Sequence, residues 1–104
     1  MTVQSLIDDL TVVCEDTHEL ALPKGLHRGI AWHRYGRQAV KGDDQTVLAV
    51  PKLQLDLLWT DSDDTLLDDV ESVLDTNLLP YTEQDVFYDE SYERLRCIIQ
   101  VVVV

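Results

Sequence analysis

Three closely spaced carboxylates, Asp61, Asp63 and Asp64, have the spacing that most resembles a metal-binding motif in this sequence. Calcium loops of the EF-hand type need a glycine at the sixth position and a glutamate at the twelfth. Counting from Asp61, those positions hold Leu66 and Ser72, so the spacing does not fit a calcium loop. Carboxylates also stabilise the positive end of a helix dipole. We therefore interpret the cluster as the acidic start of a helix.

The other residue types that can do chemistry show no catalytic pattern. The three histidines and two cysteines lack zinc-ligand spacing, no serine lies in a G-x-S-x-G elbow, and the glycines form no phosphate loop. Two cysteines are also too few for a disulfide framework, so we expect free, buried thiols. The sequence therefore predicts no catalytic residue, no metal site, no cofactor and no enzymatic activity.

Length and charge narrow the remaining classes. A chain of 104 residues builds one domain with a single core. Its net charge of -12 argues against specific nucleic-acid binding and against binding to anionic membranes. No apolar run is long enough to span a bilayer, and acids stand near the start where a signal peptide carries bases. We expect a protein that acts in the cytoplasm.

Two amphipathic helices are predicted. Residues 2–17 carry an apolar stripe, with Thr2 as the N-cap. The second helix follows the acidic cluster, with Asp61 or Ser62 as its cap and Asp63 and Asp64 in its first turn. Its apolar stripe consists of Leu66, Leu67, Val70, Val73, Leu74 and Leu78.

Four strands are predicted from alternation and β-branched content. They are residues 30–35, a long strand that ends at residue 59, a short strand from residue 86 to 88, and residues 95–104. Residues 36–45 are interpreted as a loop, and Pro51 predicts a bulge or an edge position. The fold class is α+β, a single domain over residues 1–104. About four mostly antiparallel strands form one sheet, with two helices packed on one face, in the order α-β-β-α-β-β.

Charge is segregated along the chain. Residues 24–41 hold five of the eight bases and no acid, whereas residues 42–93 hold fifteen acids and the single base Lys52. An acidic, solvated surface with an incidental basic loop explains this simply. The alternative is self-complementarity, in which a basic hairpin on one copy meets an acidic helix on the next. The unprotected Val-rich strand at the C-terminal end would also need a partner. The predicted contact residues are Arg34, Arg37, Lys41, Asp68, Asp69 and Glu71.

The order of these elements resembles the tail terminator (tail completion) proteins of long-tailed bacteriophages and prophages. The features that carry the resemblance are distributed over nearly the whole chain. They are a short first helix, the aromatic strand Ile30-Ala31-Trp32-His33-Arg34-Tyr35, a charged hairpin, the strand around Leu53 to Thr60, the acidic helix with Val70-Glu71-Ser72-Val73-Leu74, and a last strand with Arg94 and Arg96. The family's frequent Pro-Tyr before the first strand has no match here.

The resemblance implies a non-enzymatic structural subunit. Such proteins assemble as hexameric rings that cap the tail tube and help to join the tail to the head. The implied partners are further copies of the chain, the tail tube protein and head-tail connector proteins. The implied location is the host cytoplasm during assembly and then the virion tail. Two alternatives stay open: a related head-tail connector protein, and a small acidic inhibitor or immunity-type protein whose acidic helix masks a basic partner site.

Overall fold

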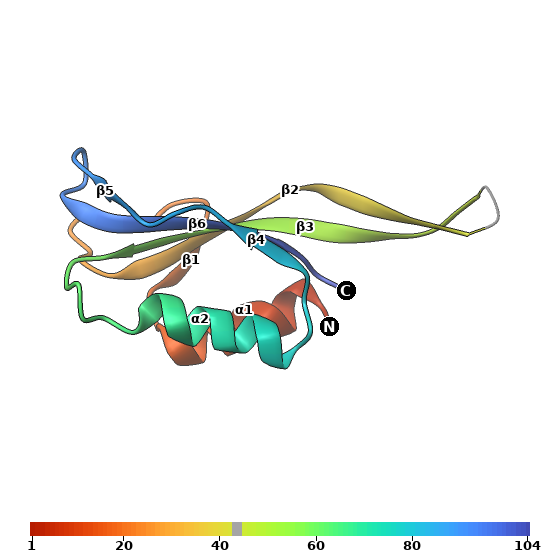
Figure 1. The fold of residues 1–104 in the computed structure, drawn as a ribbon, viewed down its shortest axis with the longest axis horizontal. Coiled ribbons are helices and arrows are strands. Elements are labelled where there is room, and N and C mark those ends of the chain that lie inside the picture. The colour runs from red at the N-terminus through yellow and green to blue at the C-terminus, as the bar shows by residue number, and fades with distance from the viewer. Residues whose placement is uncertain (43–44) are drawn as a thin grey trace.

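The computed structural model describes residues 1–42 and 45–104, and no side chain from 38 to 48. It contains two helices and a six-stranded sheet, so the predicted α+β class is confirmed (Figure 1). Each of the four predicted strands overlaps a strand of the structure, although the ends differ. The structure has two further short strands that the sequence did not predict. The elements are α1 (Val3–Val13), β1 (Thr17–Glu19), β2 (Gly29–Gly42), β3 (Gln45–Trp59), α2 (Leu66–Thr76), β4 (Tyr81–Glu83), β5 (Phe87–Asp89) and β6 (Arg94–Val102).

The sheet is mostly antiparallel, with the strand order β1-β2-β3-β6-β4 and with β5 also paired to β6. Only β1 runs parallel to its neighbour, β2. The strands that the sequence did not indicate, β1 and β4, have 3 residues each. Segments so short show no period of their own, because their pairing to distant strands defines them.

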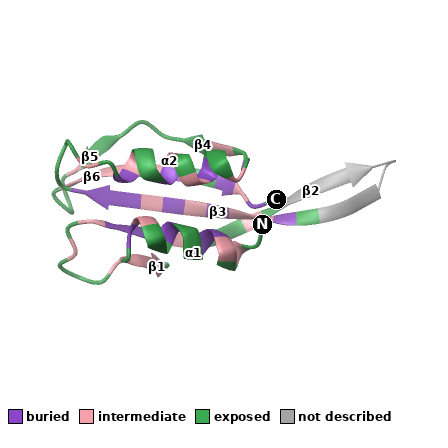
Figure 2. Cartoon of the chain, turned by 90° about the horizontal axis from the view of Figure 1, so that it is seen from below, coloured by how far each residue is buried: buried purple, intermediate pink, exposed green. Residues whose placement is uncertain are grey.

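The core lies between the sheet and the two helices, which cover the same face (Figure 1). Alternate residues of β3 point inward, as the period-2 pattern predicts, and Leu53, Leu55 and Leu57 have no exposed surface. Leu6 and Leu10 of α1 and Val70 and Leu74 of α2 meet them and are equally buried (Figure 2). Burial of these apolar side chains is the main favourable term in folding.

Helix α1 begins as predicted and ends earlier than predicted. The Thr2 hydroxyl accepts a hydrogen bond from the Ser5 amide, and the Ser5 hydroxyl accepts one from the Thr2 amide, which completes a capping box. The prediction of a helix through residue 17 is wrong, because α1 stops at Val13 and Cys14 is extended. The chain turns there to pair β1 with β2, and the Thr17 hydroxyl donates to the Cys14 carbonyl at 2.6 Å.

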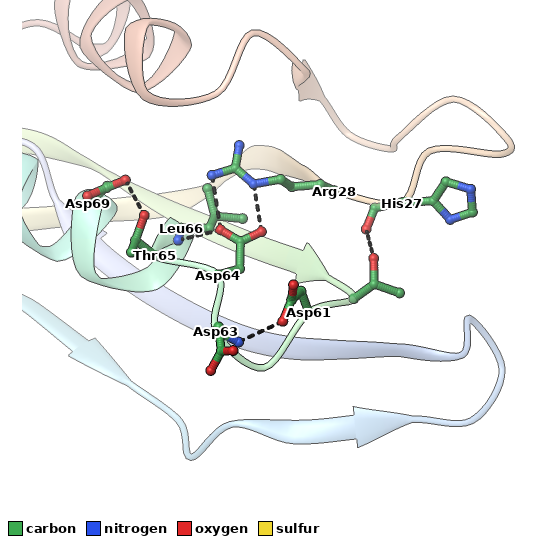
Figure 3. Close-up of polar contacts among 9 residues, drawn as sticks. His27, Arg28, Asp61, Asp63, Asp64, Thr65, Leu66 and Asp69 are labelled. Carbon is green, nitrogen blue, oxygen red and sulfur yellow. Dashed lines mark hydrogen bonds and ion pairs between the residues drawn. The ribbon is translucent and has the colours of Figure 1, made fainter.

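Helix α2 also starts later than predicted (Figure 3). The Asp61 carboxylate accepts from the Asp63 amide, and the Asp64 amide donates to the Asp61 carbonyl, so residues 61–64 form a turn. The prediction that Asp61 or Ser62 caps this helix is therefore wrong. Asp63 and Asp64 also precede the helix, whose N-cap is Thr65 without a side-chain cap bond. The acids of its first turn are Asp68 and Asp69.

Asp64 instead ties the start of α2 to the start of β2. Its carboxylate forms a two-point ion pair with the Arg28 guanidinium, at 2.8 and 3.2 Å (Figure 3). One of its oxygens also accepts from the Leu66 amide at 2.9 Å. The Arg28 side chain, 36 residues away in sequence, therefore binds the carboxylate that the sequence assigned to the helix start. A capping pattern in the local sequence does not reveal such a distant partner.

The predicted loop at residues 36–45 is wrong over most of its length, because β2 and β3 extend into a long two-stranded ribbon (Figure 1). We call residues 36–42 of β2 and 45–51 of β3 the arm. It leaves the body at one end and gives the molecule extents of 49 × 25 × 22 Å. The radius of gyration is 14.6 Å, above the ~13 Å expected of a compact chain of about this length.

A bulge stands where the arm begins. The pairing shifts between Arg34 and Gly36, which leaves Tyr35 as the extra residue of β2. On β3, pairing with β6 begins at Lys52, so Pro51 lies at the point where β3 loses its second neighbour. This agrees with the expectation that Pro51 takes an edge or bulge position.

The Val-rich strand β6 is not an open edge. It pairs with β3 on one side, and with β5 and then β4 on the other. The expectation of an unprotected Val-rich edge is therefore wrong for β6, because the two short strands cover it.

Candidate functional site

The arm joins the body at a group of cations. Arg34 pairs with Leu53 across the ribbon, and Arg37 pairs with Pro51. Leu53 and Pro51 are two residues apart on β3, so the register places both arginines on the side of the ribbon that continues the helix-covered face. Both arginines are exposed, and neither lies within 4.0 Å of a carboxylate of the described residues.

Two lysines belong to the same region. The Lys52 ammonium lies 5.0 Å from the centre of the Tyr35 ring, a cation–π distance. Lys41, the third predicted basic contact, lies among residues 38–48, whose side chains are outside the described part of the structure. Residues 34–52 therefore carry four of the eight bases of the sequence, with Asp43 and Asp44 as their only acids.

The predicted acidic contacts on α2 do not form one uniform surface. Asp68 and Asp69 are exposed in the first turn, and Asp69 accepts a hydrogen bond from the Thr65 hydroxyl at 3.0 Å. Asp69 borders the groove between α1 and α2, where Asp9 also lies. Glu71 is half-buried and lies on the side of Asp68, one turn further along the helix, away from Asp69. None of the three carboxylates pairs with a cation of the described residues.

Glu71 belongs to a group of carboxylates that links α2 to β4. Partial burial raises the pKa of its carboxyl group, and the charges of Glu83, Asp68 and Asp75 raise it further. The acidic surface of α2 is thus continuous with the start of β4. Burial and Asp75 raise the pKa of Tyr81 in the same place.

The face of the sheet without helices carries an ion network that the sequence reasoning missed. Arg96 of β6 holds Asp56 of β3 through two hydrogen bonds and Asp89 of β5 through a third at 2.8 Å. Hydrogen bonds to Asp56 and Asp89 raise the pKa of the Arg96 guanidinium, which stays charged. The alternation places Asp56 and Arg96 on the outward face, but their diagonal pairing follows only from the register of β3 against β6.

This network fixes the turn between β5 and β6. The Asp89 carboxylate accepts hydrogen bonds from the backbone amides of Ser91 at 2.9 Å and Tyr92 at 3.3 Å. The Arg96 guanidinium lies 5.9 Å from the ring centres of both Phe87 and Tyr92. The aromatic side chains around the turn are therefore held in place by charge-assisted bonds.

A pocket of about 440 Å³ lies between the β1–β2 connection and this turn. Its walls are largely apolar, with Leu22, Leu26 and Leu58 among them, and Lys24 and Arg94 border it. Arg94 donates to the His27 ring nitrogen at 2.7 Å. Among its described lining residues, the pocket lacks the paired acid and base, or the activated nucleophile, that a catalytic site needs.

Within residues 1–42 and 45–104, no group of three or more His, Cys, Asp or Glu side chains is arranged to hold a metal ion. Cys14 and Cys97 are buried free thiols, and burial raises the pKa of Cys97 to about 11, so this thiol is unreactive at neutral pH. The candidate functional features of the described residues are therefore the charged surfaces, the exposed aromatic rings and the arm, which extends beyond the strands that flank β2 and β3.

Comparison with family models, with curated proteins and with solved structures gave no match. No helix in the described part of the chain has the length and apolar content needed to cross a membrane.

Proposed function

We propose that this chain is a non-enzymatic assembly subunit of the tail-terminator kind, which forms a ring on the tail tube of a long-tailed bacteriophage or prophage and helps to join tail and head. Hexamers are the proposed form. Its partners are further copies of itself, the tail tube protein and head-tail connector proteins. Assembly takes place in the host cytoplasm, and the product is part of the virion.

The arm is the observation that carries this proposal. Among the described residues, β1 pairs with β2 only over residues 30–32, and β6 pairs with β3 only over residues 52–59. Both outer edges of the arm therefore lack a neighbouring strand of the described chain. A two-stranded ribbon alone is only marginally stable in water. A 14-residue and a 15-residue strand extended in this way suit a contact with another molecule.

Charge supports a contact between copies. Residues 34–52 have a net charge of +2, from four bases and two acids, in a chain of net charge -12. The remainder of each chain is therefore strongly acidic and attracts the arm of another copy. A head-to-tail contact of this kind is heterologous, and it closes into a ring when the rotation per subunit permits.

The test is to mix the purified protein with a tail tube protein encoded beside it and to measure the mass of the complex by light scattering, with electron microscopy of the product. The proposal predicts rings at tube ends, and no such rings when Arg34→Glu and Arg37→Glu are combined. A protein that stays monomeric and leaves the tube uncapped contradicts the proposal.

The inhibitor alternative has one observation in its favour. Asp68 and Asp69 are exposed at the positive end of α2 and are not paired with a cation of the described residues. Such a surface suits a basic partner site. Tight, salt-sensitive binding to a basic nuclease, abolished by Asp68→Lys but not by Arg37→Glu, would replace the ring proposal with this one.

A further inference from the structure

Exposed apolar side chains concentrate at the edge of the sheet far from the arm. Residues 83–93 include four of the ten large exposed hydrophobic residues of the described chain: Val86, Phe87, Tyr88 and Tyr92, whose exposed fractions are 44%, 39%, 58% and 58%. We call residues 83–93 the aromatic edge. Phe87 and Tyr92 both lie beside the Arg96 guanidinium, whereas Tyr88 follows Phe87 on β5 and lies on the other side of that strand. Exposed aromatic rings close together are typical of protein-binding surfaces.

The same edge is uniformly acidic. It holds Glu83, Asp85, Asp89, Glu90 and Glu93 and no base. Asp89 is used internally by Arg96, whereas the other four carboxylates are exposed and lie in no ion pair among the described residues. Rings combined with carboxylates suit a partner that offers arginine or lysine, through cation–π contacts and ion pairs.

From these features we infer that the aromatic edge of one copy is the docking surface for the arm root of another copy, where Arg34 and Arg37 stand on one side of the ribbon and Lys52 on the other. This inference rests on the proposed function, since it requires that copies associate, and it names the surface that the arm meets. It replaces the α2 carboxylates Asp68, Asp69 and Glu71 as the arm's principal partner.

The arm root and the β5–β6 turn of the aromatic edge cannot meet within one chain. The β5–β6 turn lies at the end of the long axis opposite the arm (Figure 1), and the view from below shows the same separation (Figure 2). A contact between them must therefore join two copies. Because the two patches differ, the contact is heterologous and leaves one of each free for the next subunit.

The aromatic edge is also pre-organised. Arg96 fixes Asp89, and Asp89 fixes the backbone at Ser91 and Tyr92, so the rings lose little freedom when a partner binds. Among the described residues, the exposed carboxylates Asp68 and Asp69 of α2 are not held by a comparable network of charge-assisted hydrogen bonds. Asp68 and Asp69 offer charge, but α2 contributes none of the large hydrophobic side chains that are exposed among the described residues. Aromatic and arginine anchors contribute most of the affinity of typical interfaces, whereas exposed charges contribute little.

Disulfide trapping between separately made variants tests the inference even if association is weak. Arg37→Cys protein is mixed with Tyr88→Cys protein and oxidised, and mixed dimers are counted on a non-reducing gel. The native Cys14 and Cys97 are buried and contribute little. Two cysteines join only when their Cα atoms come within about 7 Å. Parallel mixtures use Asp68→Cys on α2 and, as the background control, Val12→Cys, at an 88% exposed position of α1.

The inference predicts mixed dimers for Tyr88→Cys well above both other mixtures. An excess with Asp68→Cys instead, or no excess over Val12→Cys in any mixture, overturns it. Tyr88→Ala should also weaken self-association about tenfold, whereas Val12→Ala, at an exposed position of α1 outside both surfaces, should not. If the protein forms rings on tail tubes but Arg37→Cys and Tyr88→Cys do not cross-link, the inference is wrong and the proposed function stands. If the two variants cross-link but the protein does not bind the tube, the proposed function is wrong and the contact between copies stands.

Discussion

The carboxyl groups of Asp64 and Glu71 are seven residues apart and have pKa values shifted in opposite directions. The Arg28 guanidinium stabilises the charged form of Asp64 and lowers its pKa, against the effect of burial. Glu71 forms no ion pair among the described residues, so burial and three neighbouring carboxylates favour its protonated form. Each shift gives a different dependence of stability on pH.

Asp64→Asn should destabilise the fold at pH 7 by about 1 kcal/mol, because it removes a charge-assisted bond to Arg28 that is partly exposed to solvent. A lowered pKa stabilises the native state above the usual pKa of aspartate, and that stabilisation is lost as the pH falls through the folded-state value. Urea unfolding of both proteins should therefore converge towards about pH 3. Asp63→Asn, at an exposed neighbour, should change little; equal effects of the two substitutions would contradict the role of the ion pair.

Glu71→Gln should have the opposite effect. A raised pKa means that the native state binds the proton more tightly than the unfolded state, so the charged glutamate destabilises the fold as the pH rises through its folded-state value. Removing the charge should stabilise the protein at pH 7 by about 0.5 kcal/mol. Thermal unfolding should show that gain at neutral pH and none near about pH 3. A similar gain from Glu15→Gln, at an exposed position after α1, would show that only net charge matters.

Among the elements, the end of α2 has an unusual residue in its closing motif. The Leu78 amide donates to the Asp75 carbonyl, and the Leu79 amide donates to the Leu74 carbonyl, which is the Schellman arrangement. Leu78, the residue after the C-cap Asn77, has a φ angle of 56°. This left-handed backbone conformation favours glycine. The sequence pattern placed Leu78 in the apolar stripe, and this is wrong, because its side chain is 84% exposed.

Leu78→Gly should therefore stabilise the protein by about 1 kcal/mol, because it relieves the left-handed backbone strain and gives up almost no burial. Thr76→Gly, two residues earlier in ordinary helical backbone, is the matched control and should destabilise it. Denaturant titration measures both. A loss of stability in Leu78→Gly would mean that the leucine makes contacts in solution that outweigh its strain.

Shortening the arm separates assembly from folding. Gln38 pairs with Val50, so replacing residues 39–49 by Asn-Gly closes a tight hairpin at that pair. Leu53, Leu55 and Leu57, which β3 contributes to the core, stay in place, so the thermal midpoint should change by only a few degrees. Ring formation on tail tubes should be lost. A shortened protein that still forms rings would remove the arm from the proposed contact.

For the whole molecule, the parts that the sequence predicted are those set by local patterns. The N-cap at Thr2, the alternation from Leu53 to Leu57 and the stripe of α2 through Leu74 each depend on residues close in sequence. The missed parts depend on distant partners. Arg28 binds Asp64, β4 and β5 cover β6, and Arg96 joins Asp56 to Asp89. The arm was missed because its glycines and charges are typical of a loop, although its backbone is paired.

The candidate contact residues stay a prediction. Charge segregation pointed to Arg34 and Arg37, which lie at the root of the arm and form no ion pair among the described residues. It also pointed to Asp68, Asp69 and Glu71, which the structure divides between two sides of α2. The sequence did not indicate Tyr88 and Tyr92 as contact residues, because the exposure of their rings depends on how the short strand β5 pairs with β6.

The single extra residue at Tyr35 has a consequence for compatibility between subunits. If Tyr35 were paired instead of bulged, Arg37 would face Val50 rather than Pro51, and the arginine would project from the opposite side of the ribbon. Whether this residue is bulged or paired thus determines which surface the arm presents to a neighbouring copy. Two homologous subunits of equal length that differ only in this pairing would present their arginines on opposite sides of the arm and would be sorted into separate rings, even with identical charges.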